Sequence, residues 1–289
     1  MRSLFKSEKA EQEYFQHYHK TLAIFEVPYT AKYVNTSYGK THILIFGDQS
    51  KKPLLLLHGM TMSSMMWYPN VKHLIKERCV YAVDVLGDFG KSLPVKIINN
   101  NKAAADWLYE VLDGLHLNKC DLAGHSMGGF LALNFTLHYP NRVSKLILFA
   151  PAGSFDRLNP MFYIRVFPAI LLHCKWLTYK AFRWLAGRGS KDILDPRFKA
   201  LITLGYLGAR PLLHVIPTVF SDELFLNYNN KTLLLIGDKE VIYRANKALK
   251  QARRVIPHIE AYKIDGAGHL LTGLNANIVN DYMIRFLKD

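Results

Sequence analysis

The amino-acid sequence predicts an α/β fold: a mostly parallel, twisted sheet with helices on both faces and a helical cap insertion. Short apolar runs alternate with helical patterns over most of the 289 residues. Several of these runs are apolar at consecutive positions, as in parallel strands that are buried on both faces. The alternation stops for about eighty residues in the second half of the chain. The first two observations indicate the sheet, and the third indicates the insertion.

The apolar runs predict strands, and the segments between them predict helices. We expect strands at residues 41–46, 53–58, 79–85, 119–124, 145–150, 231–237 and 259–265. Apolar residues at helical spacing predict helices at residues 101–115, 127–139, 243–256 and 275–288.

The insertion lies between residues 151 and 230, where no buried strand is evident and prolines separate short helical segments. We interpret residues 153–228 as a cap that folds over the sheet, and residues 1–152 and 229–289 as the core. Most large apolar side chains of the cap should be buried against the sheet. These side chains are Phe155, Met161, Phe162, Tyr163, Phe167, Trp176, Tyr179, Phe182, Trp184 and Phe198.

Composition excludes several classes of protein. The chain is 50% hydrophobic and 21% charged, which is typical of a globular protein and not of a disordered or coiled-coil chain. Its longest notable uncharged apolar run has nine residues, about half the length of a membrane-spanning helix. The charged N-terminus does not resemble a secretory signal.

Three widely spaced cysteines, Cys79, Cys120 and Cys174, suggest neither disulfides nor zinc, so we expect a reducing, cytoplasmic location.

The net charge of +14 bears on partners. The densest basic cluster lies on an amphipathic helix, which favours a solvated face over a nucleic-acid surface. Cations lie among the aromatic residues of the cap and would suit an anionic lipid surface. Because prolines break any long amphipathic face there, we do not expect membrane contact. The sequence makes no prediction of the oligomeric state. The cations in question are Lys247, Lys250, Arg253 and Arg254 in the basic cluster, and Arg165, Lys175, Lys180 and Arg183 in the cap.

A serine between two glycines carries the strongest chemical signal. Gly124, Ser126 and Gly128 belong to a G-x-S-x-G motif that directly follows a predicted strand and directly precedes a predicted helix. A serine on such a tight turn has a strained backbone, and neighbours without side chains relieve the crowding. The helix that follows directs its first amides at the serine, where negative charge would develop. The pattern predicts a nucleophilic Ser126, the alternative being a turn with a capping serine.

A second element could stabilise an oxyanion. Gly59 follows a predicted strand and lets the chain turn, so that the N–H of Met60 can point into a cleft. Together with the N–H of Met127 it would supply two donors to a tetrahedral intermediate.

A base and an acid are expected from two later loops. His269 follows the last predicted strand, and an imidazole can take the proton of a serine near neutral pH. The base in turn needs an acid to orient it. Asp238, Glu240 and Asp265 are the candidates, and we favour Glu240 because it lies deeper in its loop, three residues beyond Gly237.

The order serine, acid, histidine, each at a strand end, resembles the α/β-hydrolase superfamily over nearly the whole chain. The resemblance implies that Ser126 is the nucleophile, Glu240 the acid and His269 the base. It also implies that Met60 and Met127 supply the oxyanion amides. Glutamate replaces the commoner aspartate. Residues 84–92 resemble the D-x-x-G-x-x-G-x-S loop of the superfamily, and the insertion resembles its cap.

Within the superfamily, the chain resembles small cap-bearing bacterial carboxylesterases that act on arylpropionate esters. We therefore expect a serine hydrolase that cleaves small-molecule esters with apolar or aromatic groups through an acyl-serine intermediate, without a cofactor or a metal. Two alternatives remain. The same triad could serve a carbon–carbon hydrolase, a perhydrolase or an acyltransferase, or the fold could serve as a ligand receptor.

Overall fold

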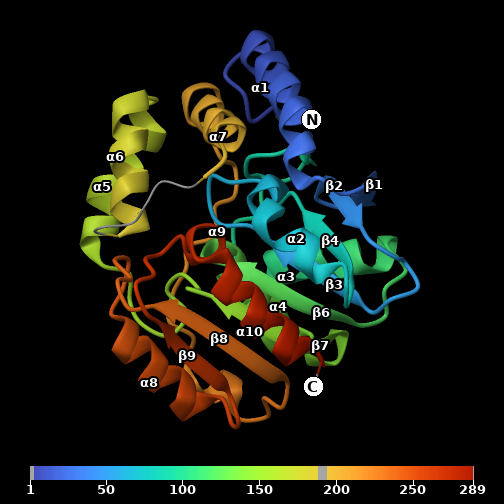
Figure 1. Ribbon diagram of the computed structural model, residues 1–289, viewed down its shortest axis with the longest axis vertical. Coiled ribbons are helices and arrows are strands. Elements are labelled where there is room, and N and C mark those ends of the chain that lie inside the picture. The colour runs from blue at the N-terminus through green and yellow to red at the C-terminus, as the bar shows by residue number, and fades with distance from the viewer. Residues whose placement is uncertain (1–2, 188–193, 289) are drawn as a thin grey trace.

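The computed structural model describes residues 3–187 and 194–288 and shows one twisted sheet between two layers of helices (Figure 1). Nine strands of the described chain form the sheet in the order β1-β2-β4-β3-β6-β7-β8-β9, with β5 beside β2. Strands β3, β4, β6, β7, β8 and β9 run parallel, whereas β1, β2 and β5 join by antiparallel pairing. The strands are β1 (Tyr29–Thr36), β2 (Gly39–Phe46), β3 (Pro53–Leu57), β4 (Cys79–Val83), β5 (Leu93–Pro94), β6 (Cys120–His125), β7 (Val143–Phe149), β8 (Lys231–Gly237) and β9 (Glu260–Ile264).

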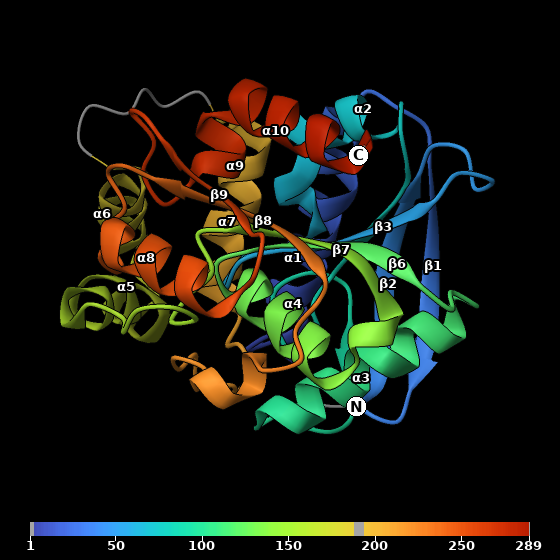
Figure 2. The ribbon, with the colours of Figure 1, turned by 90° about the horizontal axis from the view of Figure 1, so that it is seen from below.

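Helices cover both faces of the sheet, as Figure 2 shows. Helices α2 and α10 pack together on one face, and α3, α4 and α8 lie on the other. The sequence predicts α3, α4, α8 and α10 but not α2. The apolar stripes of α3, α8 and α10 face the strands, whereas α4 is buried on nearly all sides. The bounds are α2 (Tyr68–Leu74), α3 (Asn101–Gly114), α4 (Met127–His138), α8 (Ala245–Val255), α9 (Leu271–Leu274) and α10 (Ala276–Lys288).

All seven predicted strands are present, with ends that differ by no more than two residues, and the α/β prediction is confirmed. Strand β1 escaped the sequence analysis because it lies at the edge of the sheet and seven of its eight residues are not buried. Helix α1 (Glu8–Thr21) escaped it as well, because only three of its residues are buried. Neither element shows the apolar pattern by which buried elements are recognised.

In the described part of the segment between β7 and β8 there are three α-helices and one 3-10 helix. They are α5 (Pro160–Leu172), α6 (Lys175–Ala186), α7 (Pro196–Gly208) and η4 (Asp222–Phe225). Asn159 and Asp195 cap α5 and α7 by accepting backbone N–H groups, and each is followed by a proline at the first helical position. Helix α1 packs along α7, as Figure 1 shows. The cap boundaries at residues 153 and 228 stay a prediction.

Among the helices of residues 3–187 and 194–288, none has both the length and the hydropathy needed to cross a lipid bilayer.

A buried carboxylate at the end of β4 joins four parts of the chain. Asp84 accepts hydrogen bonds from the Tyr18 hydroxyl at 2.9 Å, the Ser64 N–H at 2.8 Å and the Lys91 N–H at 2.9 Å, and it contacts Nδ1 of His42 at 2.9 Å. Burial alone would raise the pKa of Asp84, but the hydrogen bond and charge of His42 outweigh it and lower that pKa to about 2. The ionised carboxylate thus ties α1 and β2 to the segments that contain Ser64 and Lys91.

Replacing Asp84 with asparagine should therefore destabilise the protein in a pH-dependent way. Because folding lowers the pKa of Asp84 from its unfolded value of about 3.9, the ionised carboxylate stabilises the folded state at any pH above that unfolded value. This stabilisation is lost as the pH falls through about 2. We expect the gap in unfolding free energy between native protein and Asp84→Asn to shrink by about 2 kcal/mol from pH 6 toward pH 2. Urea unfolding at several pH values measures it. The exposed Asp265→Asn should cost no more than about 0.5 kcal/mol throughout, and a gap for Asp84→Asn that does not depend on pH contradicts the assignment.

Candidate active site

Ser126 occupies a sharp turn between β6 and α4. Its backbone φ is 53° and ψ is −115°, a conformation that a residue with a side chain rarely adopts. Three backbone hydrogen bonds hold it there: the Ser126 N–H donates to the Phe149 carbonyl at 2.9 Å, and the Ser126 carbonyl accepts from the N–H groups of Phe130 and Ala152 at 3.0 Å each. The strain is thus fixed by the neighbouring strand β7, and it sets the direction of the hydroxyl.

The two glycines of the motif allow main chains to approach closely. A Cβ atom on Gly124 would lie 2.1 Å from the Gly128 carbonyl oxygen, and one on Gly128 would lie 2.2 Å from the Leu57 carbonyl oxygen. Neither glycine has a positive φ. The glycines therefore relieve crowding because they have no Cβ atom, not because they adopt an unusual backbone conformation. The end of β3 can then lie against the start of α4.

Ser126, His269 and Glu240 form one hydrogen-bonded row. Nε2 of His269 lies 2.8 Å from Oγ of Ser126, and Nδ1 lies 2.8 Å from Oε2 of Glu240. A carboxylate can only accept, so Nδ1 carries the proton and Nε2 accepts from the serine hydroxyl. Residues far apart in the sequence thus meet in the order that proton transfer from a serine requires.

The structure brings Glu240 to His269, not Asp238 or Asp265. The Glu240 side chain is fully buried, and its Oε1 accepts from the N–H groups of Val241 at 2.8 Å and Ile242 at 3.0 Å. Asp238 and Asp265 are exposed. The three donors around Glu240 compensate for its desolvation and keep the carboxylate in place.

A second histidine, His125, supports the backbone of the first. Its Nε2–H donates to the His269 carbonyl at 2.8 Å, and the His269 N–H donates to the Leu185 carbonyl of α6 at 2.9 Å. Burial, together with the nearby His269, lowers the pKa of His125 to about 3. A neutral His125 can therefore hold His269 without repelling the imidazolium that forms during proton transfer.

His58 orients the peptide that leads to Met60. Its Nδ1–H donates to the Gly59 carbonyl at 2.9 Å, and its Nε2 accepts from the Val85 N–H at 2.8 Å. Carbonyl and N–H of a trans peptide point in opposite directions, so the Met60 N–H is turned away from His58. Among the described residues it has no acceptor. A Cβ atom on Gly59 would lie 3.5 Å from Cβ of Ser126, so this loop lies against the serine.

The N–H of Met127 opens helix α4 and, in the described part of the chain, also has no acceptor. The first amides of a helix point out of its end and carry partial positive charge. In the described chain, Met60 and Met127 therefore each present an N–H group without an acceptor near Ser126.

The sequence analysis missed the groups that hold the Met60 loop from its other side. The Thr61 N–H donates to both carboxylate oxygens of Asp88, at 3.0 Å each, and Thr61 has a strained φ of 59°. The Tyr206 hydroxyl of α7 lies 2.6 Å from Oγ1 of Thr61. Burial raises the pKa of Asp88 to about 7. Asp88 lies in the 84–92 motif, which was the only signal available in the sequence.

The cap residues do not all behave as expected. Phe155 and Phe198 are buried, and the ring of Phe182 contacts that of Tyr206. Only two of the ten large apolar side chains are therefore buried, so the expectation that most are buried is wrong. Four are exposed, namely Tyr163, Phe167, Trp176 and Tyr179.

Two cavities lie near the site. A cavity of about 20 Å³ beside His125 has mainly apolar walls, which include Met66, Phe198 and Leu270. A cavity of about 840 Å³ opens behind Glu240, with Arg165 and Tyr243 in its wall. Ser126 lines neither of them.

Comparison with known proteins supports the predicted resemblance. A family model described as alpha/beta hydrolase fold matches residues 52–275. The carboxylesterase nap of Bacillus subtilis, named as uncharacterized, is 34% identical over 95% of this chain and 92% of its own length. Carboxylesterase YbfK of the same organism is 32% identical over 95% of this chain and 93% of its own.

A solved structure agrees along the whole chain. The crystal structure of naproxen esterase from Bacillus subtilis is similar with a TM-score of 0.91 at 32% identity, and the match covers 97% of this chain and 99% of that one.

The close approach at Gly124 makes a prediction about stability. Gly124→Ala places a methyl group 2.1 Å from a backbone oxygen, so strand and helix must separate, at a cost of about 4 kcal/mol or more. The control is Gly266→Ala, whose new methyl group meets nothing within 4 Å and costs about 1–2 kcal/mol through its φ of 72° alone. Thermal unfolding measures both, and equal costs contradict the contact argument.

Proposed function

Because this chain belongs to the α/β-hydrolase fold family and is a carboxylic ester hydrolase like its full-length relatives, we propose that it acts through an acyl-serine intermediate on Ser126. The observation that carries the proposal is the row of 2.8 Å contacts from Ser126 through His269 to Glu240. A serine beside an oriented, neutral imidazole is an activated nucleophile.

The first half-reaction forms the acyl-enzyme. Oγ of Ser126 attacks the ester carbonyl carbon while Nε2 of His269 takes the hydroxyl proton. The carbonyl oxygen becomes an oxyanion, which accepts hydrogen bonds from the N–H groups of Met60 and Met127. The intermediate then expels the alcohol, which receives the proton from Nε2, and the acyl group stays on Oγ. Glu240 holds Nδ1–H and stabilises the imidazolium.

The second half-reaction repeats the sequence with water. Nε2 of His269 takes a proton from a water molecule, and the resulting hydroxide attacks the acyl-serine carbonyl. The second tetrahedral intermediate uses the same two amides, and its collapse returns the proton from His269 to Oγ of Ser126. The products are the free carboxylic acid and the original enzyme, so neither a cofactor nor a metal enters the balance.

We further propose that the preferred esters carry apolar or aromatic groups. Apolar side chains, among them Met62, Met66 and Leu270, lie beside His125, the residue before Ser126, and favour apolar groups. The similar Bacillus protein named naproxen esterase suggests an arylpropionate acid. The proposed partner is a small-molecule ester. A cytoplasmic location stays a prediction from the three cysteines, all of which are free.

Ser126→Ala should abolish ester turnover. Loss of the nucleophile lowers kcat by at least about 10⁴-fold, since the remaining donors cannot form the acyl-enzyme. Initial rates on p-nitrophenyl esters that range from acetate to phenylpropionate measure both the loss and the proposed preference. Unchanged thermal unfolding serves as the control for folding. Turnover by the alanine variant within tenfold of native would refute the acyl-serine mechanism.

Glu240→Gln tests the acid against its neighbour. An amide in place of the carboxylate no longer stabilises the imidazolium and presents an NH₂ group that Nδ1–H cannot use, so kcat should fall about 10³- to 10⁴-fold. The matched control is Asp238→Asn, an exposed change in the same loop, which should alter kcat less than about twofold. A larger loss for Asp238→Asn than for Glu240→Gln would assign the acid to Asp238.

A further inference from the structure

Helices α5 and α6 expose an unusual number of large apolar side chains. Seven of the seventeen exposed large hydrophobic residues of the described chain lie between residues 163 and 179, with exposures from 38% to 68%. We call this set the hairpin surface. It consists of Tyr163, Ile164, Phe167, Leu171, Leu172, Trp176 and Tyr179.

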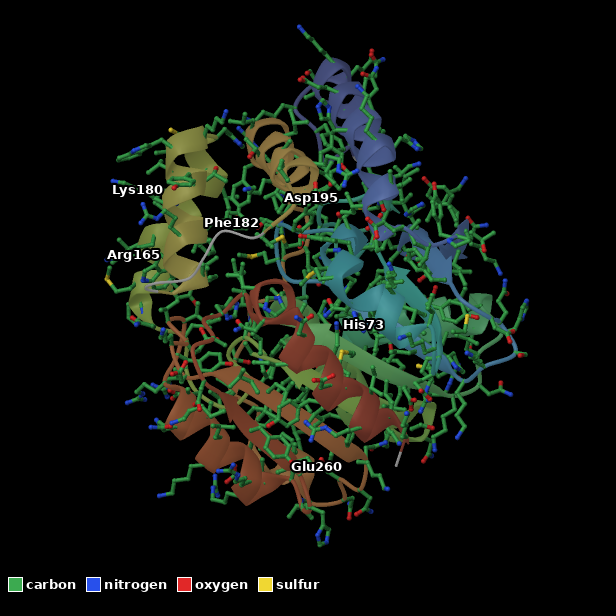
Figure 3. The ribbon with its side chains drawn as sticks, viewed as in Figure 1. His73, Arg165, Lys180, Phe182, Asp195 and Glu260 are labelled. Carbon is green, nitrogen blue, oxygen red and sulfur yellow. The ribbon has the colours of Figure 1, made fainter. Side chains whose placement is uncertain are left out.

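The surface arises because only one side of each helix is covered. On α6 the buried residues Thr178, Ala181 and Leu185 follow helical spacing, and the opposite side is exposed. Figure 3 shows Phe182 on the inner side of the hairpin, toward α7, with Lys180 on its outer side. The sequence analysis judged each helix alone and expected prolines to interrupt any apolar face. Two short helices side by side form that face together (Figures 1 and 2).

The charges on the hairpin have one sign. Residues 157–187 contain no aspartate or glutamate, while α5 and α6 carry Arg165, Lys175, Lys180 and Arg183. In the described part of the chain none of these four cations has a carboxylate partner. Lys180 instead lies over the ring of Trp176, with 3.5 Å from Nζ to the ring centre.

Apolar side chains, interfacial aromatics and cations that have no carboxylate partner among the described residues together fit one kind of partner. We propose that the hairpin surface docks the protein on an anionic phospholipid bilayer. Leucine and isoleucine would enter the acyl boundary, tryptophan and tyrosine would lie at the headgroups, and the cations would reach the lipid phosphates.

The same features argue against other partners. A second copy of this chain would bring the four cations of each hairpin against those of the other across a two-fold axis, and like charges repel. Nucleic acid would use the cations and aromatic rings but leave Leu171, Leu172 and Ile164 exposed to water, because phosphates and sugars offer them no apolar partner.

The docking surface is joined to the candidate active site. The Leu185 carbonyl at the end of α6 accepts the His269 N–H, and a Cβ atom on Gly268 would lie 2.2 Å from the Ala186 carbonyl oxygen. Docking therefore brings the helix that touches His269 to the lipid, where apolar esters concentrate. This last consequence rests on the proposed function, whereas the docking does not.

Vesicle sedimentation of the full chain tests the proposal. The probes are vesicles of phosphatidylcholine alone and vesicles in which part of it is replaced by phosphatidylglycerol. The native protein should partition into the anionic vesicles at least about tenfold more strongly, and added salt should weaken the binding. Absence of binding, or equal binding to both vesicles, overturns the proposal.

Variants that add the same charge at different places test whether the hairpin surface is the part of the protein that contacts the lipid. Leu172→Glu combined with Trp176→Glu should reduce binding to anionic vesicles at least about tenfold. The control pair, Ile216→Glu with Leu226→Glu, adds the same charge at residues that are 71% and 81% exposed outside the hairpin, and should change binding far less. Equal losses refute the assignment to the hairpin. Lys175→Gln should cost about fivefold, on anionic vesicles only.

A further measurement tests insertion of the hairpin with a variant that still binds the vesicles. Brominated phospholipids should quench tryptophan emission of the native protein, and quenching should fall in Trp176→Phe, which keeps an aromatic ring and remains bound. Quenching that does not depend on Trp176 contradicts insertion of the hairpin. Thermal unfolding checks each variant, and these exposed positions should tolerate substitution. Self-association that the glutamate variants abolish, without vesicle binding, would assign the surface to a second copy.

Discussion

The close approach of main chains around Ser126 is the constraint on which the site depends. Gly128 allows the start of α4 to lie directly against the carbonyl of Leu57 at the end of β3. That contact joins two neighbouring parallel strands and places the Met60 loop beside the serine. Ser126 bears a strained φ at this contact, and its backbone hydrogen bonds to Phe149 and Ala152 hold that conformation in place. The proposed nucleophile and the proposed oxyanion donors are thus positioned by one close contact between backbones.

The buried histidines show how charge is distributed around that contact. Burial lowers the pKa of His58 and of His125, so both serve as neutral hydrogen-bond donors. His269 differs because Glu240 is within hydrogen-bond distance of its Nδ1. A positive charge that forms on His269 therefore lies beside the Glu240 carboxylate, and neither His58 nor His125 carries a second positive charge. This arrangement favours the imidazolium only where the proposed mechanism requires it.

The parts of the fold and site that the sequence predicts are those with local signals. Ser126, His269 and Glu240 each come after a strand that the sequence predicts, and their order carries a family resemblance. Asp88 has no such signal, because its role depends on burial and on Thr61, 27 residues away. Helix α1 is polar on most sides and owes its position to α7, which only tertiary contacts define. Local patterns therefore locate the chemistry, and long-range packing decides what supports it.

The inner side of the cap contacts two parts of the candidate site, His269 and the loop of Met60. Leu185 of α6 holds the backbone of His269, and Tyr206 of α7 holds Thr61 beside the Met60 loop. Any displacement of α6 and α7 must therefore act together on His269, the proposed base, and on the loop of Met60, a proposed oxyanion donor. The hairpin surface lies on the opposite side of α6, since Trp176 and Tyr179 are exposed while Leu185 is buried. One helix can thus contact an external surface with one side and fix the catalytic geometry with the other, so residues on the two sides can be changed independently.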